Sequence, residues 1–177
     1  METITEYKDA LQAKKKVFLG GTCGKSTWRD YVISKLNIDY FNPVVDDWNE
    51  EAYKKELEER ENCDFCLYTI TPHMEGVYSI AEVVDDSNKR PEKTILCVLE
   101  KEGDKKFNKS QLKSLKAVGK TVQKNGGKWF EDLDWTISYL NGGIQVDKNG
   151  NIGIGMDSGN KTTTGTYGVP IGKPTKK

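Results

Sequence analysis

Two glutamates near the middle of the chain could form the carboxyl pair of a glycosyl-transfer site. Glu82 lies inside an otherwise mostly apolar segment, VYSIAEVV, one helical turn after Ser79, where the pattern does not predict a solvated carboxylate. A carboxylate in such surroundings either belongs to a local polar network or takes part in a reaction. Glu75 precedes it in the loop TPHMEG. Glycosyl transfer uses one carboxylate as nucleophile and one to handle the proton, so Glu82 and Glu75 are the candidate catalytic pair.

A glycine-rich loop, GGTCGKS, follows an apolar run and precedes a segment with helical spacing. Backbone amides at such a helix start, with Ser26 beside them, suit a phosphate or a sugar hydroxyl. The loop differs from the phosphate-binding P-loop, because Leu19 stands five positions before Gly24, where that motif has its first glycine. A P-loop-like nucleotide kinase, in which Lys25 would bind phosphate, is therefore one alternative. A loop that only turns a strand into a helix is another.

The cysteines and the single histidine do not form a metal-binding pattern. Cys63 and Cys66 make one CxxC pair, but a zinc site usually needs four ligands, and the chain has no second pair. Only His73 could add an imidazole. Cys66 lies in an apolar run, which favours packing, and we expect the thiols to be reduced. We therefore predict no metal and no other cofactor.

Alternating strand-like and helical segments predict an α/β fold that positions these residues. Short apolar runs typical of strands lie at residues 16–20, 38–41, 65–70, 94–99 and, more weakly, 126–130. Helical spacing is found at residues 27–36, 48–60, 77–84, 110–124 and 133–140. Strands that alternate with helices pair in parallel through right-handed crossovers. We expect one α/β domain over residues 14–141, with a five-stranded, mostly parallel sheet flanked by helices, of the flavodoxin or Rossmann type.

The carboxyl ends of the strands are the expected ligand-binding edge of this sheet. The loops that reach this edge are GGTCGKS, NPVVDDW and TPHMEGVYS. Trp28 and Trp48 flank the first two loops, where each could either pack in the core or stack on a base.

The composition changes after Asn141, because nine of the remaining 36 residues are glycine. Four apolar residues alternate around an Asn-Gly pair, which is a strong hairpin signal: Ile144, Val146, Ile152 and Ile154. We therefore divide the rest of the chain, residues 142–177, into a Gly-rich β-hairpin and a flexible tail. An isolated hairpin is marginal in water, so either the parent domain or a neighbouring subunit must cover its apolar face.

Charge and hydropathy restrict the partners and the location. The chain has 27 Lys plus Arg against 27 Asp plus Glu, so no net charge favours long nucleic acid or an anionic membrane. No run approaches the roughly 20 apolar residues that span a bilayer, and the first residues lack the apolar stretch of a secretory signal. We expect a cytoplasmic protein that binds neither a membrane nor a long nucleic acid.

Several segments resemble the nucleoside 2-deoxyribosyltransferase-like family. They are VFLGGTC, STWRDYV, FNPVVDDW, NCDFCLYTITP and MEGVYSIAEVVDDSNKRP, which together cover about residues 16–100. In that family the glutamate of the Gly-x-x-Ser-x-x-Glu element is the nucleophile, which the resemblance places at Glu82. An acidic residue in the preceding loop binds the deoxyribose or handles the proton, and Glu75 is its nearest match, although relatives commonly have Asp in a shorter loop.

The resemblance implies cleavage or transfer at the N-glycosidic bond of a 2-deoxyribonucleoside or its 5′-monophosphate, with Glu82 attacking C1′. The implied substrate contacts are Gly21 and Thr22 at the sugar or phosphate end, Asn42, Asp46 and Asp47 at the base end, and Met74, Gly76 and Ser79 in the last loop. No metal is needed, and a homo-oligomer is expected. The alternatives are the nucleotide kinase, which would need ATP and Mg²⁺, and a catalytically silent nucleotide-binding or interaction module.

Overall fold

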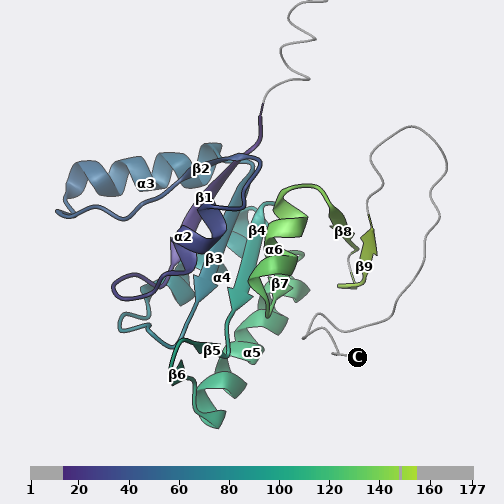
Figure 1. Cartoon of the computed structure of the whole chain (residues 1–177). Helices are drawn as coiled ribbons and strands as arrows, with labels where there is room; N and C mark the ends of the chain where they lie inside the picture. The colour runs from purple at the N-terminus through teal and green to yellow at the C-terminus, as the bar shows by residue number, and fades with distance from the viewer. Residues whose placement is uncertain (1–13, 148, 155–177) are drawn as a thin grey trace, which may run out of the picture.

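The central feature of the molecule is one five-stranded sheet in which every strand pair is parallel. The computed structural model of the chain, shown in Figure 1, describes residues 14–147 and 149–154. In spatial order the strands are β2 (Asp39–Phe41), β1 (Lys16–Gly21), β3 (Phe65–Ile70), β4 (Thr94–Val98) and β7 (Lys128–Phe130). This confirms the predicted α/β fold, and the order is that of flavodoxin-type doubly wound sheets.

Helices cover both faces of the sheet, as Figure 1 shows. On one face pack α2 (Trp28–Ile33) and α6 (Leu133–Leu140), and on the other pack α4 (Tyr78–Lys89) and α5 (Lys109–Lys124). Because β1, β3 and β4 are thereby buried on both sides, they appear in the sequence as continuous apolar runs. A further helix, α3 (Glu50–Asn62), buries only Glu59 and Arg60. In the part of the chain that the structure describes, no helix is long and apolar enough to cross a membrane.

Two local features differ from the sequence-based expectation. The helix expected to end at residue 84 continues to Lys89, because its last turns bury Asp86 and Ser87, whose polar side chains interrupt the apolar pattern. A small antiparallel pair, β5 (Lys101–Glu102) and β6 (Lys105–Lys106), was not predicted. It turns at Gly103, where φ is +60°.

The predicted C-terminal hairpin is confirmed as the antiparallel strands β8 (Ile144–Val146) and β9 (Ile152–Ile154). Ile144 is 7% exposed and belongs to the same apolar cluster as Leu140, while Val146 and Ile152 pack against that cluster. The parent domain therefore covers this part of the hairpin. The flexible tail predicted after it, from residue 155 on, lies outside the described residues.

Replacing Ile144 should therefore destabilise the whole domain. Ile144→Ala leaves a cavity in the cluster that α6 and the sheet share, and we expect it to lower the free energy of unfolding by about 2 to 4 kcal/mol. Urea unfolding followed by circular dichroism measures this change. Gln145→Ala is the matched control, because Gln145 is exposed on the same strand. Equal stabilities of the two variants would contradict the packing of the hairpin on the domain.

Candidate active site between the carboxyl ends of β1 and β3

Two adjoining pockets open at the edge of the sheet where β1 and β3 end. In sheets with this strand order, the connections leave β1 and β3 in opposite directions, which creates a crevice for ligands. The first pocket, of about 270 Å³, contains Glu82 and is called the Glu82 pocket below. The second, of about 250 Å³, lies against the loop after β3. Gly21, Cys23 and Ser79 line both pockets, so the two spaces are contiguous.

Gly21 allows the loop after β1 to cross β3 closely enough to shape this crevice. Its φ is +115°, and a Cβ atom at this position would lie 2.2 Å from the backbone oxygen of Thr69. The neighbouring Thr22 then donates its backbone N–H to the Thr69 oxygen at 2.9 Å and accepts the N–H of Thr71 on its hydroxyl at 2.9 Å. Only glycine fits these constraints without a shift of the backbone.

Glu82 is a nearly buried carboxylate with a perturbed protonation equilibrium. It projects from the second turn of α4 and is 8% exposed. Burial raises the pKa of Glu82 to about 7, and the negative charge of Glu56 and a side-chain hydrogen bond with it act in the same direction, whereas Arg60 opposes the increase. Nη1 of Arg60 donates to Oε1 of Glu82 at 3.1 Å. At neutral pH, therefore, this carboxyl group can either hold or release a proton.

Glu56 is the second carboxylate of the Glu82 pocket, and the sequence analysis missed it. It lies on α3 and lines the same pocket, and its presence beside Glu82 contributes to the raised pKa of that carboxyl group. The sole signal in the sequence was its spacing of four residues from Arg60, which places both side chains on one helix face. That signal is lost in the segment EEAYKKELEEREN, where most residues are charged.

Arg29 contributes a buried cation to the wall of the Glu82 pocket. Its guanidinium donates to three backbone oxygens of β1 and the following loop: Leu19 at 3.0 Å, Gly21 at 3.2 Å and Thr22 at 2.6 Å. Burial lowers the pKa of Arg29, but its usual value is so high that the side chain stays charged. The guanidinium therefore fixes the loop and places a positive charge beside the two carboxylates.

The remaining wall of the Glu82 pocket is apolar and comes from the loop between β2 and α3. Pro43, Val44, Val45 and Trp48 form it. Trp48 is 62% exposed, whereas Trp28 is 1% exposed and donates its indole N–H to the Thr22 oxygen at 2.8 Å. Of the two tryptophans considered from the sequence, Trp28 is a core residue and Trp48 is free to meet a ligand.

The family with a matching sequence model is described as nucleoside 2-deoxyribosyltransferase like, and the match covers residues 14–102. The chain belongs to this family. The matched part contains β1 to β4, both pockets and the three glutamates discussed so far, and it confirms the resemblance seen in the loop motifs. No curated protein shows a significant match to the chain. Membership in the nucleoside 2-deoxyribosyltransferase-like family supports glycosyl transfer on a nucleoside as the general class of reaction.

The structure distributes the residues predicted for a nucleoside 2-deoxyribosyltransferase-like site over three places. Gly21, Ser79 and Glu82 line the Glu82 pocket. The second pocket is lined by Gly21 and Ser79 and also by Thr22, Met74, Glu75 and Gly76. Asn42, Asp46 and Asp47 line neither pocket, although the residues between them do. Glu75 and Glu82 are thus in adjoining pockets, and the carboxylate that shares a pocket with Glu82 is Glu56.

The glycine-rich loop does not present a vacant phosphate site at the start of α2. The carboxylate of Glu102 accepts the hydroxyl of Ser26 at 2.7 Å and the backbone N–H of Thr27 at 2.9 Å. Burial opposes ionisation there, but hydrogen bonds from Thr71 and Ser26 hold the pKa of Glu102 below its usual range. An internal anion therefore occupies the helix start that a P-loop reserves for phosphate, which argues against the nucleotide kinase alternative.

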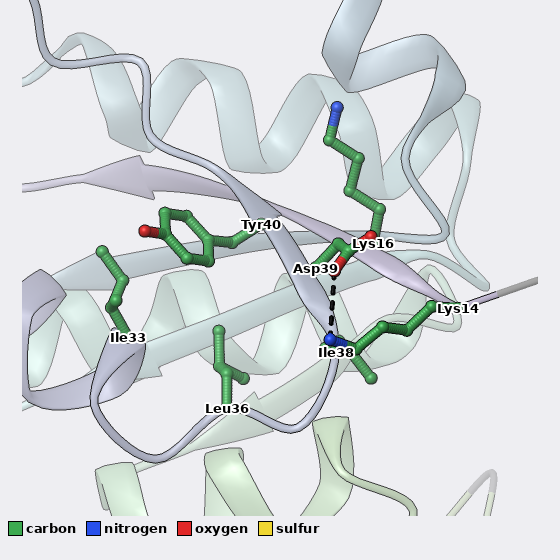
Figure 2. A pocket seen from close by; sticks show the side chains of 7 residues that line it. All are labelled: Lys14, Lys16, Ile33, Leu36, Ile38, Asp39 and Tyr40. Carbon is green, nitrogen blue, oxygen red and sulfur yellow. Dashed lines mark ion pairs between the residues drawn. The ribbon is translucent and has the colours of Figure 1, made fainter.

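A further pocket lies at the opposite end of the strands. It has a volume of about 410 Å³ and is lined by Lys14, Lys16, Ile33, Leu36, Ile38, Asp39 and Tyr40. Figure 2 shows its single carboxylate, Asp39, in an ion pair with Lys14, at 3.2 Å. Both side chains are more than half exposed, so this pair has ordinary surface chemistry. The Glu82 pocket is smaller, but it holds the buried carboxyl pair and is the better candidate for the active site.

Proposed function

We propose that the protein cleaves or transfers at the N-glycosidic bond of a 2-deoxyribonucleoside or its 5′-monophosphate, with Glu82 as the nucleophile. The observation that supports this most is the carboxyl pair, because Glu82 and Glu56 line one pocket, where the negative charge of Glu56 helps to raise the pKa of Glu82. A retaining glycosyl transfer needs one ionised carboxylate that attacks and one protonated carboxyl group that donates. In this proposal Glu82 attacks and Glu56 donates.

In the first step, a carboxylate oxygen of Glu82 forms a bond to C1′ and the C1′–N bond breaks. Its electron pair leaves with the base, and Glu56 supplies the proton that the base takes up. In the second step, water or the N–H of a second base attacks C1′ and gives its proton to Glu56. The C1′–O bond to Glu82 breaks, and the electron pair returns to the carboxylate. Hydrolysis and transfer differ only in the attacking molecule, and in both the sugar keeps its anomeric configuration.

The chemistry of the pocket walls supports an orientation for the substrate. The apolar wall with Val44, Val45 and Trp48 suits the flat face of a base. The second pocket then receives the sugar and its 5′ substituent, next to Thr22 and Ser79. In this orientation Glu75 contacts the sugar, while Asn42, Asp46 and Asp47 keep their predicted place at the outer end of the base.

The proposal includes a homo-oligomer in the cytoplasm. Val77 and Tyr78, at the start of α4 beside the second pocket, are 66% and 65% exposed, and a second copy of the chain would cover them. Exposed apolar side chains that adjoin a pocket are typical of interaction surfaces. All four cysteines are free thiols, which supports a reducing compartment.

Base release from a substrate panel tests this function directly. The protein is incubated with deoxyribonucleosides, their 5′-monophosphates and the matching ribonucleosides, with and without an acceptor base, and the products are separated by chromatography. We expect free base without ATP or added metal, and a new nucleoside when the acceptor is used. Activity on the deoxyribonucleosides but not on the matching ribonucleosides would identify the 2-deoxy sugar as the recognised group. No base release from any of these substrates would contradict the proposal.

Trp48→Ala should weaken substrate binding without disturbing the fold. Because Trp48 is 62% exposed on the pocket wall, its removal costs little core packing but removes a stacking surface. Stacking of a base on an aromatic ring contributes about 1 to 3 kcal/mol, so we expect KM to rise roughly 5- to 100-fold, with a smaller change in kcat. Steady-state kinetics measure this effect. Trp48→Phe, which keeps an aromatic ring, should recover most of the affinity.

A further inference from the structure

Arg60 lies in a fixed position between two buried carboxylates. Its Nε and Nη2 atoms donate to Oδ2 and Oδ1 of Asp86, at 3.2 and 2.7 Å. The third nitrogen, Nη1, donates to Oε1 of Glu82 at 3.1 Å. Asp86 is 0% exposed, and the hydroxyl of Tyr68 donates to its Oδ2 at 2.5 Å. A bidentate pair of this kind leaves the guanidinium only one orientation.

We propose that Arg60 is a positioning residue for the nucleophile, which holds Oε1 of Glu82 in place and stabilises the ionised form of this carboxyl group. This inference rests on the proposed function. Both Arg60 and Glu56 come from α3, but of the two carboxyl groups in the pocket it is Glu82 to which the guanidinium donates. A charge-assisted hydrogen bond favours the ionised form of its acceptor, so Arg60 opposes the increase in the pKa of Glu82 that burial causes.

The same contact selects the attacking oxygen. Arg60 occupies Oε1 of Glu82, which leaves Oε2 to form the bond to C1′. While Glu82 is an ester of the sugar, its negative charge is absent and the ion pair with Arg60 is lost. When water or a base displaces the sugar, the charge returns to Glu82 beside a guanidinium that Asp86 has kept in place. Arg60 therefore also favours the departure of Glu82 in the second step.

The other charged and titratable groups around Glu82 do not stabilise its ionised form in this way. They are Glu56 on α3, Asp86 and Tyr78 on α4, Arg29 on α2 and Cys23 in the loop after β1. The charges of Glu56 and Asp86 raise the pKa of Glu82, and Arg60 lowers it. Arg29 lines the pocket too, but its guanidinium is held by the backbone oxygens of β1 and the following loop.

Two variants with opposite expected effects test the proposal. In wild type, kcat/KM should rise with pH as Glu82 ionises. Arg60→Met removes the cation with an apolar side chain of similar length, and Asp86 keeps its ion pair with Arg90 and its hydrogen bond from Tyr68. Without the cation, we expect this acidic limb to move up by about 1 to 3 pH units. Asp86→Asn keeps Arg60 and removes a negative charge, so the limb should move down. Lys16→Met, which breaks the α3 ion pair between Lys16 and Glu59, should leave it unchanged.

An NMR titration of Glu82 tests the same proposal without depending on enzyme activity. The side-chain carboxyl carbons of glutamate are labelled with ¹³C, and the Glu82 signal is assigned by its loss in Glu82→Gln. The midpoint of the pH titration of this signal is then measured by NMR in each folded variant. Opposite shifts of the midpoint, in the directions given above, support the inference. Midpoints that stay at the wild-type value, or that move in the same direction in both variants, overturn it, even if the variants lose activity. Base release by wild type remains the separate test of the proposed function.

Discussion

Glu82→Gln should reduce base release by about 10³-fold or more while the protein stays folded. Glutamine keeps the volume of the side chain and a carbonyl oxygen that can still accept from Arg60, but it cannot form the bond to C1′. Single-turnover measurements with the best substrate of the panel determine this loss, and intact-protein mass spectrometry should find the deoxyribosyl adduct on wild type but not on the variant. Base release within about tenfold of wild type would show that Glu82 is not the nucleophile.

The same variant should be more stable than wild type in alkaline solution. The pKa of Glu82 is raised from 4.5 to about 7 in the folded protein. Between these pH values the folded protein keeps a proton that the unfolded chain has lost, so wild-type stability falls as pH rises from about 4.5 to 7, by up to about 3 kcal/mol. Glutamine does not titrate and avoids this loss. Urea unfolding at pH 4 and pH 8 measures it: similar stabilities at pH 4 and a more stable variant at pH 8 are expected.

The position of Glu82 could be predicted from the sequence, because a carboxylate there interrupts a recognisable apolar helix. The sheet could be predicted for a related reason, since β1, β3 and β4 are buried on both faces and consist mostly of apolar residues. No apolar segment surrounds Glu56, so the sequence does not mark its carboxylate as unusual. It lies on α3, which buries only Glu59 and Arg60 and is rich in charge along its whole length. Amphipathic spacing cannot identify a pocket residue on a helix of that kind.

Contacts between distant parts of the chain explain the rest of what the sequence could not predict. Arg60 and Asp86 are 26 residues apart, and their pairing is what lets α4 continue through a buried aspartate. Glu102 reaches Thr27 across 75 residues and fills the helix start that the glycine-rich loop seemed to offer to a phosphate. A local pattern predicts which element a residue belongs to, but it does not predict the charge that the fold places opposite that residue.

Glu56→Gln should lose activity in a way that depends on the leaving base. With an ordinary purine or pyrimidine the base must gain a proton as it leaves, and removal of a general acid costs about 10²- to 10⁴-fold. A 7-methylated purine deoxyribonucleoside carries a cationic base that leaves as a neutral molecule without protonation. We therefore expect Glu56→Gln to approach the wild-type rate of base release in the first turnover with this substrate, whereas Glu82→Gln should remain slow with both.

The comparison of the two substrates also separates Glu56 from the other glutamates. Glu58→Gln is the matched control on α3, because its side chain is 67% exposed and it should release both bases at the wild-type rate. Glu75→Gln is the competing assignment, since the sequence favoured Glu75 as the second carboxylate. In one outcome the methylated purine rescues Glu75→Gln, while Glu56→Gln shows no difference between the two substrates. The proton then comes from the second pocket, and the role given to Glu56 is wrong. Rescue of Glu56→Gln alone would instead place the proton donor on α3, directly beside the nucleophile.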